Sequence, residues 1–86
     1  MTKKKVLIVH GPNLNLLGKR EENIYGNFTL YQLTSHLKKY SKEYDMELKF
    51  FQSNHEGKII DFIQERLSNY FGLIINAGAL THTSLA

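Results

Sequence analysis

Two side chains in one long connecting segment, Arg20 and Tyr25, have the types and the spacing for proton abstraction. A tyrosine phenolate is a general base, but the ordinary pKa of its hydroxyl lies well above neutral pH. The guanidinium of Arg20 keeps its charge and would lower that pKa if the segment folds the two residues together. The alternative is a Tyr25 ring that only packs against the chain, and the residue types alone leave both interpretations open.

Polar side chains also stand where the predicted strands end. Asn13 and Asn15 follow the first apolar run, and Asn76 closes the third. An asparagine at such a place orients a water or a developing oxyanion, or it stabilises a turn by bonding to its own backbone. His82 lies near the expected start of a helix, a location that favours anions, although a lone histidine equally fits a cap or a surface position.

The segment that carries these residues, Gly11–Phe28, is about three times the median connection length in compact domains. Loops of that length either have a function or are disordered. Apolar anchors such as Leu14 and Ile24 argue against simple disorder, and Gly18 and Gly26 divide the segment into parts that can turn. We therefore expect a functional loop that closes over a substrate.

Short apolar runs and helical spacing alternate along the rest of the chain. Three runs rich in apolar and β-branched residues predict strands: Lys5–His10, Glu47–Gln52 and Phe71–Asn76. Between and after them, helices are predicted from a capping box at Thr29 and Gln32 through Tyr44, over Ile59–Leu67, and from Thr81 onward. The order is β-α-β-α-β-(α).

Strands that alternate with helices predict an α/β fold, a flavodoxin-like doubly wound parallel sheet whose strand order begins 2-1-3. Ligands bind such sheets beyond the carboxyl ends of the strands, where Gly11–Phe28 and the loop Asn76–His82 would meet. The third strand would expose an edge rich in isoleucine. We therefore expect residues 1–86 to be a single domain, the N-terminal portion of a longer one, unless another chain covers that edge.

The composition excludes several classes of site. The 86 residues contain no cysteine, so disulfides and thiolate metal sites are impossible, and the four histidines lack metal-ligand spacing. A net charge of +3 without a basic stripe does not predict nucleic-acid binding. No apolar run reaches membrane-spanning length and no secretory signal is recognisable, so a cytoplasmic location is expected. The glycine-rich dinucleotide loop, the Walker A loop, a serine-rich FMN phosphate loop and the nucleophile elbow are all missing from the sequence.

Four blocks of residues together resemble the type II 3-dehydroquinate dehydratases, also called type II dehydroquinases. The blocks are Gly11–Gly18, Arg20 with Tyr25-Gly26, Gln52–Gly57, and Ile75-Asn76 with Thr81–Ser84. They follow in family order with family spacing across nearly the whole chain, and the combination is far more specific than any one block.

The resemblance implies dehydration of 3-dehydroquinate to 3-dehydroshikimate in the shikimate pathway of aromatic amino acid biosynthesis, without metal or cofactor. Tyr25 would be the base that takes a proton from the carbon next to the ketone, and Arg20 would lower its pKa and stabilise negative charge. Asn13 would hold the water that supports the enolate. Asn76 and His82 would bind substrate hydroxyl groups. Family members assemble as dodecamers built from trimers, which implies a homo-oligomer.

The sequence departs from the family pattern in two ways. Glu22 and Ala77 stand where the family often has proline, which would alter loop stiffness without changing the chemistry. The family's general-acid histidine and its remaining substrate ligands lie beyond the position of Ala86, so the 86-residue chain by itself is expected to be inactive. The alternatives are a non-catalytic flavodoxin-like module for binding or association, and an FMN or nucleotide binder.

Overall fold

The computed structural model describes residues 3–16 and 29–85 of the chain. Strands alternate with helices, and short 3-10 turns (η) add to them. In chain order the elements are β1 (Lys4–His10), η1 (Leu14–Leu16), α2 (Leu30–Glu43), β2 (Met46–Gln52), α3 (Glu56–Arg66), η2 (Leu67–Asn69), β3 (Gly72–Asn76) and α4 (Leu80–Thr83).

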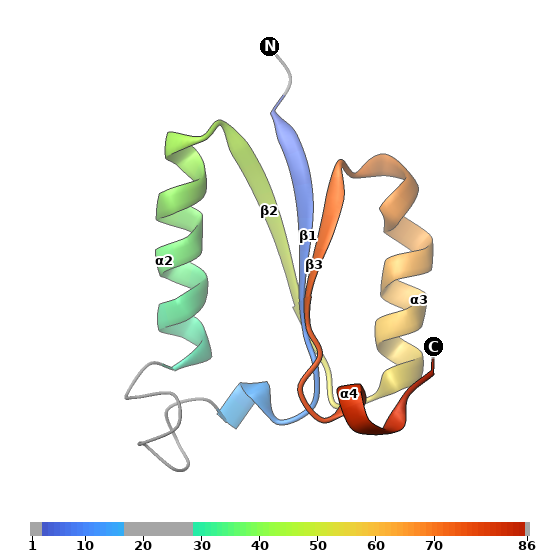
Figure 1. Ribbon diagram of the computed structural model, residues 1–86. Coiled ribbons are helices and arrows are strands. Elements are labelled where there is room, and N and C mark those ends of the chain that lie inside the picture. The colour runs from blue at the N-terminus through green and yellow to red at the C-terminus, as the bar shows by residue number, and fades with distance from the viewer. Residues whose placement is uncertain (1–2, 17–28, 86) are drawn as a thin grey trace.

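The three strands form one parallel sheet in the order β2-β1-β3, as the sequence predicted. In this register His10 lies opposite Gln52 on one side and Asn76 on the other. The polar ends of all three strands therefore lie level with one another. Helices α2 and α3 lie on opposite sides of the sheet (Figure 1), which confirms the doubly wound arrangement.

The core lies between the central strand and α3. Leu7 and Val9 are fully buried there, and they pack with Ile59 and Phe62 of α3. The Phe62 ring also stacks on Phe51 of β2, with 4.3 Å between the ring centroids. Because side chains alternate across a strand, this core fixes which face each residue of β1 presents.

Local signals account for both ends of α2. The predicted capping box is present: Gln32 N–H donates to Thr29 Oγ1 at 3.1 Å, and Thr29 N–H donates to Gln32 Oε1 at 2.9 Å. The helix ends at Glu43, and Asp45 turns the chain with a left-handed φ of 55°. Aspartate tolerates that conformation better than most residues, so the chain reverses here into β2.

Several element boundaries differ from the expectation. The strands begin at Lys4, Met46 and Gly72 rather than at Lys5, Glu47 and Phe71. Helix α3 spans Glu56–Arg66 rather than Ile59–Leu67, η1 forms at Leu14–Leu16 in the segment after β1, and α4 begins at Leu80 rather than Thr81 and ends at Thr83. Backbone bonds that join residues three apart, such as Leu80 N–H to the Ala77 carbonyl at 3.2 Å, form tight turns that leave little apolar periodicity in the sequence.

The free edge of β3 is apolar, as predicted. Ile74 and Ile75 are 56% and 48% exposed, and Phe71, just before the strand, is 70% exposed. In the described part of the chain, β1 is the strand that pairs with β3. A search of those same residues finds no helix with the length and apolarity needed to cross a bilayer.

Candidate functional site

The carboxyl ends of β1 and β3 are joined through their backbones. Gly11 N–H donates to the Asn76 carbonyl at 2.8 Å, and a Cβ placed on Gly11 would lie 2.3 Å from the Ala77 carbonyl oxygen. No side chain fits in that space, so glycine is required at this position. The close approach holds the loop that carries Asn13 against the end of the strand that carries Asn76.

A second glycine serves the same contact. Gly78 has a φ of +59°, a conformation that glycine adopts without strain, and a Cβ there would lie 3.1 Å from the Pro12 carbonyl oxygen. The loop after β1 therefore lies against the loop after β3 at Gly78.

Asn13 has an uncommon backbone conformation, with a left-handed φ of 68°. Its N–H donates to Asn54 Oδ1 at 2.8 Å, while its own side chain is exposed and makes no hydrogen bond within the described ranges. Among the described residues the Asn13 side chain does not bond to its own backbone, and the turn interpretation stays a prediction for Asn15. No described residue occupies the Asn13 side-chain amide.

Gln52 and Asn54 form a polar bridge from β2 to this turn. Gln52 Nε2 lies 3.2 Å from the Gly11 carbonyl, 3.2 Å from Asn54 Oδ1 and 3.5 Å from Asn15 Oδ1. Neither Gln52 nor Asn54 was among the site residues predicted from the sequence. The available signal was the parallel register, because Gln52 ends its strand level with His10.

Asn76 and His82 also lie on this edge of the sheet, at the end of β3 and in α4. Both are exposed, and neither side chain has a hydrogen-bond partner within residues 3–16 and 29–85. His82 is the third residue of α4, a single turn of four residues, and the role expected of it stays a prediction. Tyr25, the predicted general base, and Arg20, the cation predicted to lower its pKa, lie outside the described residues.

His10 is deeply buried at the end of β1. Only 4% of it is exposed, and neither ring nitrogen has a partner among the residues that the structure describes. Burial lowers the pKa of the imidazole, which favours the neutral ring. His10 therefore contributes a neutral polar group beneath the strand ends rather than a positive charge.

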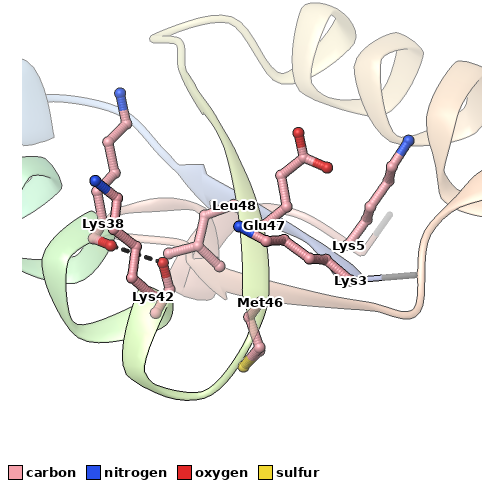
Figure 2. A pocket seen from close by; sticks show the side chains of 8 residues that line it. Lys3, Lys5, Lys38, Lys42, Met46, Glu47 and Leu48 are labelled. Carbon is pink, nitrogen blue, oxygen red and sulfur yellow. Dashed lines mark hydrogen bonds between the residues drawn. The ribbon is translucent and has the colours of Figure 1, made fainter. Parts of the chain in front are cut away.

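An open cavity of about 500 Å³ lies at the opposite end of the strands (Figure 2). Residues at the starts of β1 and β2 and near the end of α2 line it: Lys3, Lys5, Lys38, Ser41, Lys42, Met46, Glu47 and Leu48. Lys42 lies in the last turn of α2, where the negative end of the helix dipole favours a cation. The lysines are exposed, so this cavity is a solvated basic surface, separate from the asparagines at the strand ends.

The strand-end arrangement provides neutral hydrogen-bonding groups for a polar ligand. Asn13, in the loop after β1, and Asn76, at the end of β3, present side-chain amides that bond to no described residue, and His82 adds an imidazole. Within the described ranges no group of three histidine, aspartate or glutamate residues is placed to hold a metal ion. Such a set of residues can bind hydroxyl groups and orient a water.

Comparisons with known proteins agree on one family. The family model described as dehydroquinase class II matches residues 4–86. A 3-dehydroquinate dehydratase of Endomicrobium trichonymphae is 54% identical over 82 residues, which cover 95% of this chain and 57% of that protein. This chain thus spans little more than half the length of that relative.

Solved structures give the same result. The type II dehydroquinase of Butyrivibrio crossotus superposes with a TM-score of 0.91 at 47% identity, covering 98% of this chain and 59% of that one. The type II dehydroquinase of Propionibacterium acnes gives a TM-score of 0.88 at 30% identity, covering 95% of this chain and 57% of that one. The chain belongs to the class II dehydroquinase family.

Proposed function

We propose that this chain supplies the base side of a hydro-lyase that dehydrates 3-dehydroquinate to 3-dehydroshikimate. The observation that carries the proposal is the joined pair of strand ends. There a 2.8 Å backbone hydrogen bond from Gly11 to Asn76 holds the Asn13 turn beside the end of β3, and the side-chain amides of Asn13 and Asn76 bond to no described residue. Family membership supports the choice of substrate, since relatives that match over most of this chain are named 3-dehydroquinate dehydratase.

In the proposed reaction the Tyr25 phenolate takes a proton from the carbon next to the substrate ketone. The electron pair of that C–H bond forms an enolate, which then expels the neighbouring hydroxyl as water and leaves a conjugated ketone. Arg20 lowers the pKa of Tyr25 because a fixed positive charge favours the phenolate. The departing hydroxyl must take up a proton to leave as water, and the resemblance assigns the delivery of that proton to the family's general-acid histidine.

Asn13 is proposed to hold a water against the enolate oxygen. A neutral donor that is already oriented stabilises the charge where it develops, and it need not reorganise as the reaction proceeds. Its exposed side chain and its anchored backbone suit that task. Asn76 and His82 are proposed to bind substrate hydroxyl groups, which would orient the ring for proton abstraction.

Resemblance to the family leads to two further proposals about the whole enzyme. The resemblance implies a homo-oligomer, a dodecamer built from trimers in which a neighbouring subunit adds a residue to the site. It also implies a cytoplasmic location. Analytical ultracentrifugation tests the first of these proposals: a sedimentation coefficient that stays monomeric at all accessible concentrations would contradict it.

A chimera tests the catalytic proposal. Residues 4–86 replace the matched segment of the Endomicrobium trichonymphae protein, and ultraviolet absorbance follows the conjugated product. We expect turnover, and a loss of about 100-fold or more in kcat for Tyr25→Phe, as is usual when a general base is removed. Tyr31→Phe is the matched control, because Tyr31 is 80% exposed on α2. A folded chimera in which Tyr25→Phe matches its parent would refute the assignment.

A further inference from the structure

We infer that Gln52 and Asn54 are positioning residues that hold Asn13 in place. Each of them uses only one of its two hydrogen-bonding capacities, donor or acceptor, for this role. Asn54 acts only as an acceptor and Gln52 only as a donor. This inference deepens the proposed function, since it rests on the role given there to Asn13. It concerns two residues that contact the site's backbone rather than the substrate.

Two backbone groups fix the orientation of the two side-chain amides. The Asn13 N–H can only donate, so the Asn54 atom 2.8 Å away must be its oxygen. The Gly11 carbonyl can only accept, so the Gln52 atom 3.2 Å away must be its nitrogen. The 3.2 Å contact between Gln52 Nε2 and Asn54 Oδ1 is then a matched donor and acceptor, and flipping either amide would set like groups against each other.

The backbone of Asn13 needs such an anchor. Its φ of 68° lies in the left-handed region, which costs free energy in residues other than glycine and is tolerated best by asparagine and aspartate. The anchor itself is rigid, because Gln52 is the last residue of β2 and pairs in register with His10 of β1. The hydrogen bonds of Gln52 and Asn54 thus tie the turn that carries the Asn13 amide to the end of the sheet.

Because Asn54 accepts and Gln52 donates, replacing the side-chain amide by a carboxylate should have opposite effects at the two positions. Asn54→Asp keeps an oxygen acceptor for both of its donors, and in the described structure the Asn54 nitrogen donates to nothing that would be lost. Gln52→Glu removes the donor and sets a carboxylate against the Gly11 carbonyl. A role limited to general polarity or packing would make both substitutions equally mild or equally harmful.

The test measures, by NMR on the purified protein, how fast the Asn13 amide proton exchanges with water. Asn54→Leu and Gln52→Glu are expected to speed exchange about five-fold or more, the effect of losing one hydrogen bond. Asn54→Asp is expected to stay within two-fold of the parent, as is the control Asn69→Asp, which adds the same charge at an exposed asparagine of η2. Unchanged protection of Leu7 would show that the effect is local.

Turnover of 3-dehydroquinate by the chimera described above, carrying the same substitutions, gives the second readout. A positioning role predicts a fall in kcat with little change in KM for Asn54→Leu, and recovery for Asn54→Asp. Equal exchange rates in the leucine and aspartate variants, or a protected Asn13 amide in Gln52→Glu, would overturn the inference. Gln52→Leu replaces Gln52→Glu if the latter does not fold. Absence of turnover in every form would count against the proposed function alone, because the exchange rates decide the inference independently.

Discussion

Gly11→Ala is expected to be among the most damaging single-methyl changes in this chain. The added Cβ would lie 2.3 Å from the Ala77 carbonyl oxygen and 2.9 Å from its carbon, whereas ordinary contact begins near 3.4 Å. Because both partners are backbone, no side-chain rotation relieves the overlap. The loops after β1 and β3 must separate by about 1 Å, and the 2.8 Å hydrogen bond from Gly11 N–H to the Asn76 carbonyl is lost.

The magnitude follows from these two effects. Overpacking costs about 1–3 kcal/mol, and a lost backbone hydrogen bond costs about 0.5–1.5 kcal/mol. The free energy of unfolding should therefore fall by roughly 2–4 kcal/mol. For a domain of this size that lowers Tm by roughly 10–30 °C, which thermal unfolding followed by circular dichroism measures directly. The separation should also weaken binding of 3-dehydroquinate, since it moves Asn13 away from Asn76.

Gly57→Ala is the matched control, because it adds the same methyl group elsewhere in the chain. No atom lies within 4 Å of a Cβ built on Gly57, which is the second residue of α3. Alanine is favoured over glycine inside a helix by about 0.5–1 kcal/mol, so Tm should rise by a few degrees. A Gly11→Ala protein that unfolds within a few degrees of the parent would refute this view of the joined strand ends, as would a similar loss in both variants.

Three further changes test the core, the buried histidine and the helix cap. Phe62→Ala removes the ring that stacks on Phe51 at 4.3 Å, and chemical denaturation should show a loss of about 3–5 kcal/mol; a loss below 1 kcal/mol would contradict the packing. Burial holds the pKa of His10 below its ordinary 6.5, so its contribution to stability should be complete above pH 6.5 and decline as pH falls toward the lowered pKa. His10→Asn should flatten that part of a curve of unfolding free energy against pH, and an unchanged slope would argue against a buried neutral ring. Thr29→Ala should cost about 1 kcal/mol while Thr29→Ser retains the bond to Gln32 N–H; equal midpoints for the two variants in urea would show that the cap does not matter.

The sequence predicts the architecture well because its signals are local. Alternating apolar runs and helical spacing indicate a parallel sheet in the order 2-1-3, and the observed sheet has that order. The capping box at Thr29 and Gln32 is a pattern of four consecutive residues, and both of its hydrogen bonds are present. Features that depend on neighbouring residues in the chain can be inferred before a structure is known.

The polar bridge could not be inferred in this way. Asn54 bonds to a backbone group 41 positions away, and only the register of β1 against β2 brings the two together. The contact between Gly78 and Pro12 could not be inferred for a similar reason, since Pro12 comes from another loop. The deep burial of His10 likewise depends on its place in the central strand of the assembled sheet.

The candidate site was predicted in outline. Asn13, Asn76 and His82 were expected at the carboxyl ends of the strands, and the structure places all three on that edge of the sheet. Their proposed roles in binding and catalysis stay predictions, as do those of Arg20 and Tyr25. The fold adds the backbone hydrogen bond between Gly11 and Asn76, which fixes the spacing between the turn of Asn13 and the strand end of Asn76.

Titration of the isotope-labelled protein with 3-dehydroquinate, followed by NMR at the side-chain amides of Asn13 and Asn76, tests the central proposal most directly. Saturable shifts of both amides are expected, together with shifts of the His82 ring, while Lys38 and Lys42 at the opposite end of the strands stay unchanged. Shifts confined to the lysine-lined cavity, or no saturable shift at either asparagine, would contradict the assignment of the strand ends as the substrate site.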